Sequence, residues 1–269
     1  MDRDRPRIIS VANQKGGVGK TTTTINLGAA LASRGLKVLL IDLDPQGNAS
    51  TGFGVDVERR TYDTYDFMSK NKELGEVSIA SDTKNLSIIP STTDMSSADA
   101  EMMGNARRVF MMRDALDREA DTAAQFDYIL IDCPPSLNLL TLNALVASDS
   151  ILVPLQAEFF ALEGLSQLLL SVREIRETAN PDLRIEGIVL TMFDRRNNIC
   201  KQVEDDARDN LKDLVFKTMI PRNVRLSEAP SFGMPVLSYD PLSKGSVAYK
   251  SLAAEILARN PSNVRGQDD

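Results

Sequence analysis

Histidine is absent from the 269-residue sequence, and cysteine occurs only twice. The lack of histidine excludes catalysis by an imidazole side chain and disfavours a zinc site. Cys133 and Cys200 stand far apart without the spacing of metal ligands, as is typical of a protein in a reducing cytoplasm. No run approaches the roughly 18 apolar residues of a membrane span. The charged residues 1–7 contain no apolar core, so they do not form a secretory signal.

An excess of positive charge is also missing, because the net charge is −7. This value argues against a protein that is basic over its whole surface, but it allows a local basic patch. Hydrophobic residues make up 42% and charged residues 26%, as in soluble globular proteins. The length suits one large α/β domain, which we expect over residues 7–258. Residues 1–6 are then a flexible N-terminus, and residues 259–269 a polar tail.

A glycine-rich stretch separates a predicted strand, residues 8–12, from a predicted helix, residues 23–33. Strand, glycine-rich loop and helix is the order of a phosphate-binding P-loop, whose backbone N–H groups surround the phosphate. We expect Lys20 to bind the β- and γ-phosphates and to take part in catalysis, and the Thr21 hydroxyl to ligate Mg²⁺. The predicted nucleotide-binding residues here are Gln14, Lys15, Gly16, Gly17, Val18, Gly19, Lys20, Thr21 and Thr22.

This loop departs from the usual P-loop at its start. The pattern G-x-x-x-x-G-K-[ST] requires glycine at position 14, where the sequence has Gln14. A second lysine, Lys15, stands directly before two glycines, which gives the deviant Walker A pattern K-G-G-x-G-K-T. The long side chain of Lys15 could reach a nucleotide that a second subunit holds, so Lys15 is also a catalytic candidate. A glycine-rich turn with incidental lysines is a poor alternative, because the whole stretch matches.

Three aspartates follow predicted strands. Asp42 and Asp44 come after the predicted strand 37–41, and Asp132 ends the predicted strand 126–132. Continuous apolar strands indicate a mostly parallel, twisted sheet with helices on both faces, which presents functional groups at the carboxyl ends of its strands. We expect Asp42 near the Mg²⁺ shell, Asp44 to orient the attacking water, and Asp132 to hold Mg²⁺ as a Walker B acid. Either Asp42 or Asp44 alone could instead cap the turn that follows.

The rest of the chain continues the alternation of strands and helices. Residues 46–54, rich in Gly, Ser, Thr and Asn, are typical of a mobile switch loop. Ser136 is the predicted N-cap of the next helix, and the methionines within residues 94–119 are interpreted as core residues, with a partner contact as the alternative. Further strands are predicted at 86–90, 150–154 and 185–191, and helices at 61–70, 94–119, 137–147 and 245–258.

Taken together, these motifs resemble the ParA/Soj family of chromosome- and plasmid-partitioning ATPases, in the MinD/ParA superfamily. The resemblance runs from about Arg7 to Ala258, and its combination of motifs is highly specific. It implies a deviant Walker P-loop NTPase fold. The matching stretches are Lys15 to Thr22, Asp42-Leu-Asp-Pro-Gln-Gly-Asn48, Ile131-Asp-Cys-Pro-Pro-Ser136, Phe159-Phe-Ala-Leu-Glu-Gly164, Pro221-Arg-Asn-Val-Arg225 and Ser227-Glu-Ala-Pro-Ser-Phe-Gly233.

The resemblance also implies a function. Binding of ATP and Mg²⁺ would form a nucleotide-sandwich homodimer that binds double-stranded DNA without sequence preference. A ParB-type centromere-binding partner would stimulate an ATPase that is weak alone, in a cytoplasmic, nucleoid-associated protein. By this resemblance Lys15 contacts phosphate across the dimer, and Pro221 and Asn223 lie near the adenine. Arg195 and Arg225 are the expected DNA contacts. With a first strand near Arg7, we expect no N-terminal helix-turn-helix domain and no operator-specific repression.

Three alternatives belong to other functional classes. A MinD-like membrane-positioning ATPase needs a basic amphipathic C-terminal helix, whereas residues 260–269 are polar, so we expect no membrane partner. An iron–sulfur carrier or nitrogenase-like reductase needs cysteines that bridge a dimer, and Cys133 and Cys200 do not match that arrangement. A ParA paralogue that positions a protein cargo on the nucleoid stays open, because its ATPase and DNA-binding parts would look the same.

Overall fold

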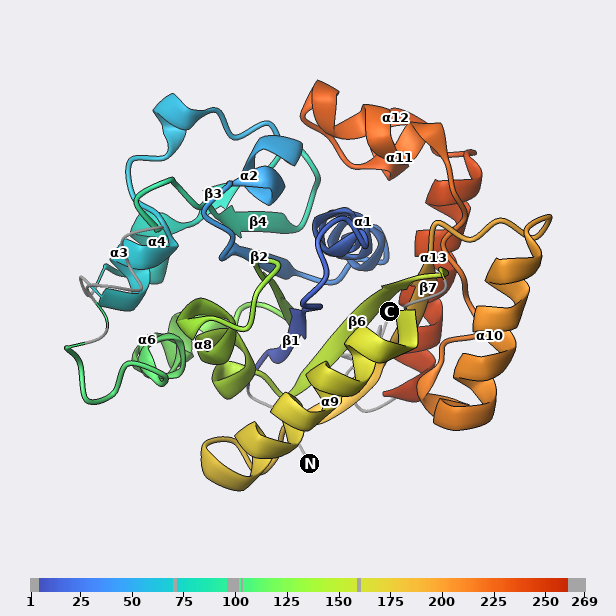
Figure 1. Cartoon of the computed structure of the whole chain (residues 1–269). Helices are drawn as coiled ribbons and strands as arrows, with labels where there is room; N and C mark the ends of the chain where they lie inside the picture. Colours follow the sequence, from blue (N-terminus) through green and yellow to red (C-terminus); the bar gives the residue numbers. More distant parts are fainter. Residues whose placement is uncertain (1–4, 70–71, 96–101, 103, 159–160, 261–269) are drawn as a thin grey trace.

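The computed structural model describes residues 5–69, 72–95, 102, 104–158 and 161–260 (Figure 1). Its centre is a seven-stranded sheet in the order β3-β4-β2-β5-β1-β6-β7. All neighbouring strands run parallel except β3, which pairs antiparallel with β4 at the edge of the sheet. The strands are β1 (Arg7–Val11), β2 (Val38–Asp42), β3 (Ile79–Ala80), β4 (Leu86–Ile89), β5 (Tyr128–Asp132), β6 (Ser150–Gln156) and β7 (Arg184–Thr191).

Helices cover both faces of the sheet, as the sequence predicts (Figure 1). They are α1 (Lys20–Ala32), α2 (Asn48–Gly52), α3 (Thr64–Ser69), α4 (Leu74–Val77), α6 (Met111–Arg118), α7 (Ala120–Ala123), α8 (Leu139–Ala147), α9 (Ala161–Thr178), α10 (Asn198–Leu211), α11 (Val224–Glu228), α12 (Val236–Tyr239) and α13 (Lys244–Arg259). Short 3₁₀ turns are η1 (Val57–Arg59), η2 (Lys212–Leu214) and η3 (Ala229–Phe232).

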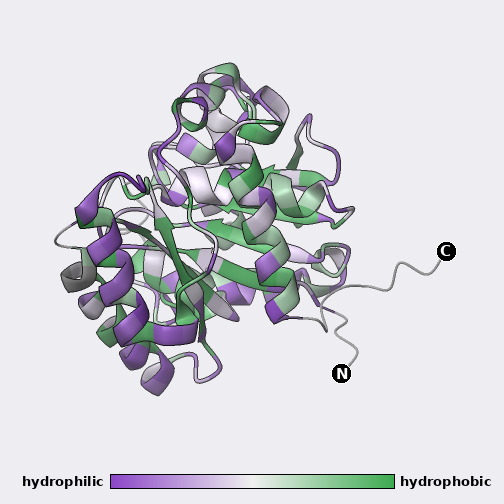
Figure 2. Ribbon diagram, turned by 90° about the vertical axis from the view of Figure 1, so that its right-hand side faces the viewer, coloured by the Kyte–Doolittle hydropathy of each residue, from purple (hydrophilic) through white to green (hydrophobic). Residues whose placement is uncertain are grey.

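Alternation of side chains along the buried strands builds two hydrophobic cores. In β5, Ile129 and Ile131 face the core that α3, α6, α8, α9 and α10 close. Tyr128 and Leu130 face the opposite core, which α1, α12 and α13 close. Figure 2 shows the strands as largely hydrophobic, with hydrophilic residues on the outer helices. The apolar runs in the sequence therefore follow from burial on both faces.

The strand register brings the predicted functional acids together. In the pairing of β2 with β5, Asp42 lies beside Asp132, and in the pairing of β1 with β5, Val11 lies beside Asp132. The chain leaves β1 for the P-loop directly after Val11. All three strand ends therefore meet at the carboxyl edge of the sheet, where parallel α/β folds carry their ligands.

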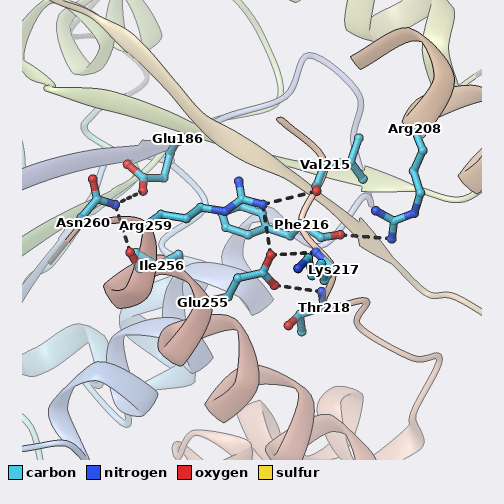
Figure 3. Close-up of polar contacts among 10 residues, drawn as sticks. All are labelled: Glu186, Arg208, Val215, Phe216, Lys217, Thr218, Glu255, Ile256, Arg259 and Asn260. Atoms are coloured by element: carbon cyan, nitrogen blue, oxygen red, sulfur yellow. Dashed lines mark hydrogen bonds and ion pairs between the residues drawn. The ribbon is translucent and has the colours of Figure 1, made fainter. Parts of the chain in front are cut away.

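The C-terminal end of α13 is fixed to the rest of the domain (Figure 3). The carboxylate of Glu255 accepts hydrogen bonds from two backbone amides of the segment between η2 and α11, at 2.8 and 3.0 Å. The guanidinium group of Arg259 lies 4.1 Å from the centre of the Phe216 ring. Asn260 donates to Glu186 Oε1 at 2.7 Å. Asn260 thus ties the end of α13 to the edge strand β7, and α13 in turn packs on α1, the helix that carries the P-loop lysine.

Most predicted elements are confirmed within a few residues, including the strands and the last helix. The burial of Met102, Met111, Met112 and Cys133 is also confirmed. Met103, residues 159–160 and the tail after residue 260 lie outside the described part of the chain, and the domain limits stay a prediction. No helix in the described ranges is both long and apolar enough to cross a membrane.

Three predictions of local structure were wrong. Met95 and Met102 are helical, but residues 104–110 form turns, so the helix predicted over 94–119 is interrupted there and α6 begins at Met111. The Asn105 side chain accepts from a backbone amide two residues on, which favours a turn. The N-cap of α8 is Asn138, whose side chain accepts from the Thr141 amide, and not Ser136. Residues 46–54 include a short helix, α2, in place of a continuous loop. Strand β3 and helix α10 were missed.

Candidate active site

The glycine-rich loop has the backbone conformation that its sequence requires. Gly17 and Gly19 have φ angles of 75° and 87°, in the left-handed region that side chains disfavour. Helix α1 begins at Lys20, and no side chain of the described residues caps its first turn. The free N–H groups at this helix start, with the positive end of the helix dipole, favour an anion. The loop is therefore shaped for a phosphate group.

The loop is anchored to two strands, β6 and β7. Asn13 donates to the Pro154 carbonyl in β6 at 2.8 Å, and its Oδ1 accepts from the Lys15 amide at 3.0 Å. The Thr191 hydroxyl, at the end of β7, donates to the Val18 carbonyl at 2.8 Å. These bonds fix the loop on both sides without using the N–H groups of the first turn of α1. Asn13 and Thr191 were not predicted as site residues.

Lys20, Thr21 and Asp132 come together as the sequence predicts. The Thr21 hydroxyl donates to Asp132 Oδ2 at 2.8 Å. Lys20 is buried and donates from Nζ to the Lys15 carbonyl at 2.9 Å, across the loop. A further hydroxyl, that of Thr24, donates to Asp132 Oδ1 at 2.9 Å. Thr24 was missed, although its spacing of three residues from Thr21 puts both on one face of a helix.

Burial shifts the protonation of these groups. Asp132 and Asp42 are fully buried side by side, and burial raises the pKa of both carboxyls. The neighbouring charge of Asp42 raises the pKa of Asp132 further, and that of Asp44 raises the pKa of Asp42. Burial lowers the pKa of Lys20, while the nearby Asp132 opposes that change. The edge of the sheet therefore holds two carboxyls and one ammonium group in little solvent, where an arriving cation would favour the ionised carboxylates.

Asp42 and Asp44 both bind the turn that follows β2. Asp42 Oδ2 accepts from the amide and the hydroxyl of Ser50, at 2.8 and 2.6 Å, and Asp42 Oδ1 accepts from the Asp44 amide at 3.2 Å. Asp44 Oδ1 accepts from the Gln46 amide at 3.0 Å, and its side chain is 8% exposed. Both acids thus cap the turn that follows β2, which the sequence analysis gave as the alternative role for either of them. Asp44 still lies at the carboxyl edge, near enough to Lys20 to influence its pKa.

A cavity of about 540 Å³ opens beside the P-loop. Gly19 and Thr22 line it together with Pro221 and Asn223, the residues that the sequence predicts near an adenine. The segment before Pro221 runs along β7, since the Ile220 amide donates to the Leu190 carbonyl at 2.8 Å. The other lining residues were not predicted at the site, although four of them (Arg222, Val224, Ser227 and Pro230) stand in the matching stretches: Thr191, Met192, Ile220, Arg222, Val224, Leu226, Ser227, Pro230 and Tyr249.

The side chains of Lys15 and of the two predicted DNA contacts make their contacts outside this cluster. Lys15 is half-exposed and pairs with Glu158, after β6. Arg195 is exposed in the turn after β7. Arg225, in α11, forms ion pairs with Glu228 at 2.7 Å and Asp240 at 3.4 Å. The structure therefore brings the phosphate-site residues together, while the two arginines lie on separate segments of the surface.

The oxygen ligands of the site suit Mg²⁺ that arrives with a nucleotide. Within the described ranges, no three or more acidic, cysteine or histidine side chains are placed to hold a metal. Mg²⁺ usually keeps several waters and is bound through one or two carboxylates plus substrate phosphates. The Thr21 hydroxyl and the Asp132 carboxylate offer such a partial oxygen set. Both carboxylates already accept hydrogen bonds, Asp42 from the amide and hydroxyl of Ser50 and Asp132 from the hydroxyls of Thr21 and Thr24.

Comparisons with known proteins identify relatives that are about half identical over nearly the whole chain. A family model described as an AAA domain matches residues 6–185. The chain is 51% identical to the chromosome partitioning protein ParA of Caulobacter vibrioides over 260 residues, which are 96% of this chain and 97% of that protein. It is 48% identical to the sporulation initiation inhibitor protein Soj of Bacillus subtilis over 252 residues, which are 94% of this chain and 98% of that protein.

A solved structure confirms the fold class. The structure of cobyrinic acid a,c-diamide synthase from Mycobacterium smegmatis with bound ADP and magnesium superimposes with a TM-score of 0.82. The two sequences are 33% identical, and the match covers 96% of this chain and 97% of that one. The name of that protein differs from those of the two relatives. Its sequence is also less similar to this chain than theirs are. The relatives at about half identity therefore decide the family.

Proposed function

The chain belongs to the ParA/Soj family of partitioning ATPases, and from that premise we propose that it is an ATP-dependent switch in chromosome or plasmid partitioning. The observation that carries the proposal is the contact of Thr21 with Asp132 beside buried Lys20, next to a cavity lined by Pro221 and Asn223. A phosphate site and a nucleoside-sized cavity adjoin, as a nucleoside triphosphate requires.

The proposed reaction is hydrolysis of ATP. The loop amides and Lys20 hold the β- and γ-phosphates, while the cavity holds the base and ribose. Asp44 orients a water molecule whose oxygen attacks the γ-phosphorus. The bond from the γ-phosphorus to the bridging oxygen breaks, and ADP and inorganic phosphate leave. The main contribution of this chain to the proposed catalysis is to position the water. Phosphoryl transfer requires little covalent chemistry from the protein.

Mg²⁺ is the proposed cofactor, held by Thr21 and, directly or through water, by Asp132. When bound, it neutralises charge on the phosphates. Thr24 keeps the Asp132 carboxylate oriented through its own hydrogen bond at 2.9 Å. Because burial raises the pKa of Asp132 to about 8, this carboxyl would lose a proton when Mg²⁺ binds below that pH.

The proposal extends to a dimer, to DNA and to a protein partner. Lys15 is exposed at the mouth of the P-loop, so it can contact phosphate of a second subunit once it leaves Glu158. Two protomers would present Arg195 and Arg225 twice, which favours DNA binding by the dimer over the monomer. A ParB-type protein then stimulates the otherwise weak ATPase on the nucleoid. The C-terminal helix found in the structure, α13, packs on α1 and is not free to act as a membrane anchor.

The test is an ATPase assay with the purified chain, Mg²⁺, arbitrary duplex DNA and the ParB-type protein of the same genome. We expect slow turnover alone and a marked increase only when DNA and the ParB-type protein are both present. Asp44→Ala should bind ATP and accumulate as a dimer in size-exclusion chromatography, because hydrolysis no longer resets the switch. An ATPase that responds to neither addition, or an Asp44→Ala protein that stays monomeric with ATP and Mg²⁺, would refute the proposed switch.

A further inference from the structure

The guanidinium group of Arg60 joins three stretches of chain around the turn that follows Asp44. Its Nε and one terminal nitrogen donate to the Val55 carbonyl at 3.1 and 2.8 Å. The same terminal nitrogen donates to the Thr51 hydroxyl at 2.9 Å. The other terminal nitrogen donates to the Ser91 carbonyl, after β4, at 2.9 Å. Because the guanidinium plane fixes its donors relative to each other, one side chain sets the geometry of α2 and its surroundings.

Gly47 shows how closely Arg60 packs against this turn. A Cβ atom at Gly47 would lie 2.4 Å from a terminal nitrogen of Arg60 and 3.0 Å from the Ser91 carbonyl oxygen. The φ angle of Gly47 is 62°, which also favours glycine. The Gly47 amide donates to the Asp44 carbonyl at 2.9 Å. Arg60 therefore packs directly on the turn that begins at Asp44.

A second set of bonds closes the arrangement. The Ser50 hydroxyl donates to Asp42 and accepts from the Ser91 amide, at 2.6 and 3.1 Å. Ser91 is thus held through its amide by Ser50 and through its carbonyl by Arg60. The turn between Asp42 and α2 is tied to β4 from both sides, and Arg60 supplies one of the two ties.

We propose that Arg60 is a positioning residue for Asp44. It keeps the turn after β2 closed, so that the Asp44 carboxylate points at the water that attacks the γ-phosphorus. The inference rests on the proposed function, because it takes Asp44 as the residue that orients this water. Arg60 donates its hydrogen bonds to Val55, Thr51 and Ser91, and none of its bonds among the described residues reaches the P-loop. Its loss should therefore change turnover and leave ATP affinity in place.

The experiment compares steady-state ATP hydrolysis and ATP affinity among variants of the full chain. For Arg60→Gln we expect kcat to fall roughly 10- to 100-fold, the cost of misplacing a reacting group by about 1 Å. KM and the Kd for ATP should stay within about twofold. Arg60→Lys should lie between the wild type and Arg60→Gln, since it keeps the charge but loses the planar set of donors. The matched control is Arg59→Gln, because Arg59 is exposed and donates one long bond, 3.4 Å, to the Gly54 carbonyl.

The Asp44→Ala variant separates the two possible failures. If Arg60 acts through Asp44, the double variant Asp44→Ala with Arg60→Gln should be no slower than Asp44→Ala alone. A fully active Arg60→Gln protein beside an inactive Asp44→Ala protein would overturn only the role of Arg60. Parallel losses of kcat, ATP affinity and melting temperature in Arg60→Gln would reduce Arg60 to a structural residue. A wild type without ATPase activity, or an active Asp44→Ala protein, would overturn the proposed function and this inference with it.

Discussion

The ammonium group of Lys15 forms an ion pair with the carboxylate of Glu158, in the segment after β6. Both side chains are partly exposed, at 45% and 36%. Ion pairs at this level of exposure contribute about 0–1 kcal/mol, so the pair can open at little cost. Lys15 is thereby held at the mouth of the P-loop by its own chain, and opening of the pair would free it for the second subunit of the proposed dimer.

Replacing Lys15 should separate nucleotide binding from dimerisation. We expect Lys15→Gln to keep the ATP affinity of the monomer within a few-fold, because Lys20 and the loop amides remain. The ATP-dependent dimer and the stimulated hydrolysis should be lost. Calorimetric titration with ATP and light scattering with ATP and Mg²⁺ measure the two properties. Glu158→Gln is the comparison, and it should keep or strengthen the dimer. A loss of monomer affinity as large as that of Lys20→Ala would make Lys15 an ordinary ligand of its own nucleotide.

Replacing Lys20 should remove ATP binding itself. Its buried ammonium group lies inside the loop, and charge-assisted hydrogen bonds contribute about 1.5–3 kcal/mol each. Loss of even one such bond weakens ATP binding by roughly 10- to 100-fold, and we expect Lys20→Ala to reach at least the upper value. The exposed Lys201 provides the control, Lys201→Ala, which should bind as the wild type does. An unchanged ATP affinity together with an unchanged melting curve would remove Lys20 from the site.

The parts of the site that are continuous in sequence were predictable. The P-loop residues stand between a predicted strand and a predicted helix, and Asp132 ends an apolar strand, so composition and order identify both. Parallel strands then bring Asp42 and Asp132 to one edge, as the register confirms. Backbone geometry and local pattern were sufficient for this part of the fold and of the site.

Contacts between distant segments were not predictable. The pairing of Lys15 with Glu158 depends on how β6 ends beside the loop, and no pattern around Glu158 marks it. Arg60 looks like one basic residue among many until the fold brings Ser91 to it. The short strand β3 was missed for a different reason. It has two residues, which are too few to show a hydrophobic periodicity.

The buried carboxyl of Asp132 should make the metal-free protein less stable as pH rises. Burial raises its pKa in the folded state above the value near 4 of an unfolded chain. The folded state then binds more protons, so stability falls from about pH 4 up to the folded pKa, by at most about 1.4 kcal/mol per pH unit. Asp132→Asn should remove this part of the slope and weaken ATP binding in Mg²⁺. Chemical denaturation with a chelator across pH measures it, and the exposed Asp206→Asn serves as control. Equal slopes in Asp132→Asn and the wild type would contradict the shift.

The DNA-binding prediction depends on two arginines in different settings. Arg225 pairs with Glu228 and Asp240, so a DNA phosphate must replace carboxylate partners there. Arg195 forms no ion pair with any described residue and is exposed. A charge reversal at this position, Arg225→Glu, would place a third carboxylate beside Glu228 and Asp240 and so add a repulsion unrelated to DNA. We therefore include Arg225→Gln, which removes the positive charge without adding a negative one.

A protein with a net charge of −7 needs a local basic surface to bind DNA, and a dimer presents that surface twice. We expect retention on arbitrary duplexes with ATP and Mg²⁺, little with ADP, and a steep loss with salt. Each variant, Arg195→Glu or Arg225→Gln, removes two arginines from the dimer. The plot of the logarithm of the DNA-binding constant against the logarithm of salt concentration has a negative slope. Each variant should reduce the magnitude of this slope by about 2, because the dimer loses two phosphate contacts and each contributes about 0.9. Arg34→Glu, beyond the far end of α1 from the P-loop, changes the net charge as much as Arg195→Glu and more than Arg225→Gln, and it should leave the slope unchanged. Equal retention on DNA with ATP, with ADP and without nucleotide would exclude a nucleotide-controlled switch on DNA. A confirmed dimer that binds no duplex at low salt would favour a cargo other than DNA.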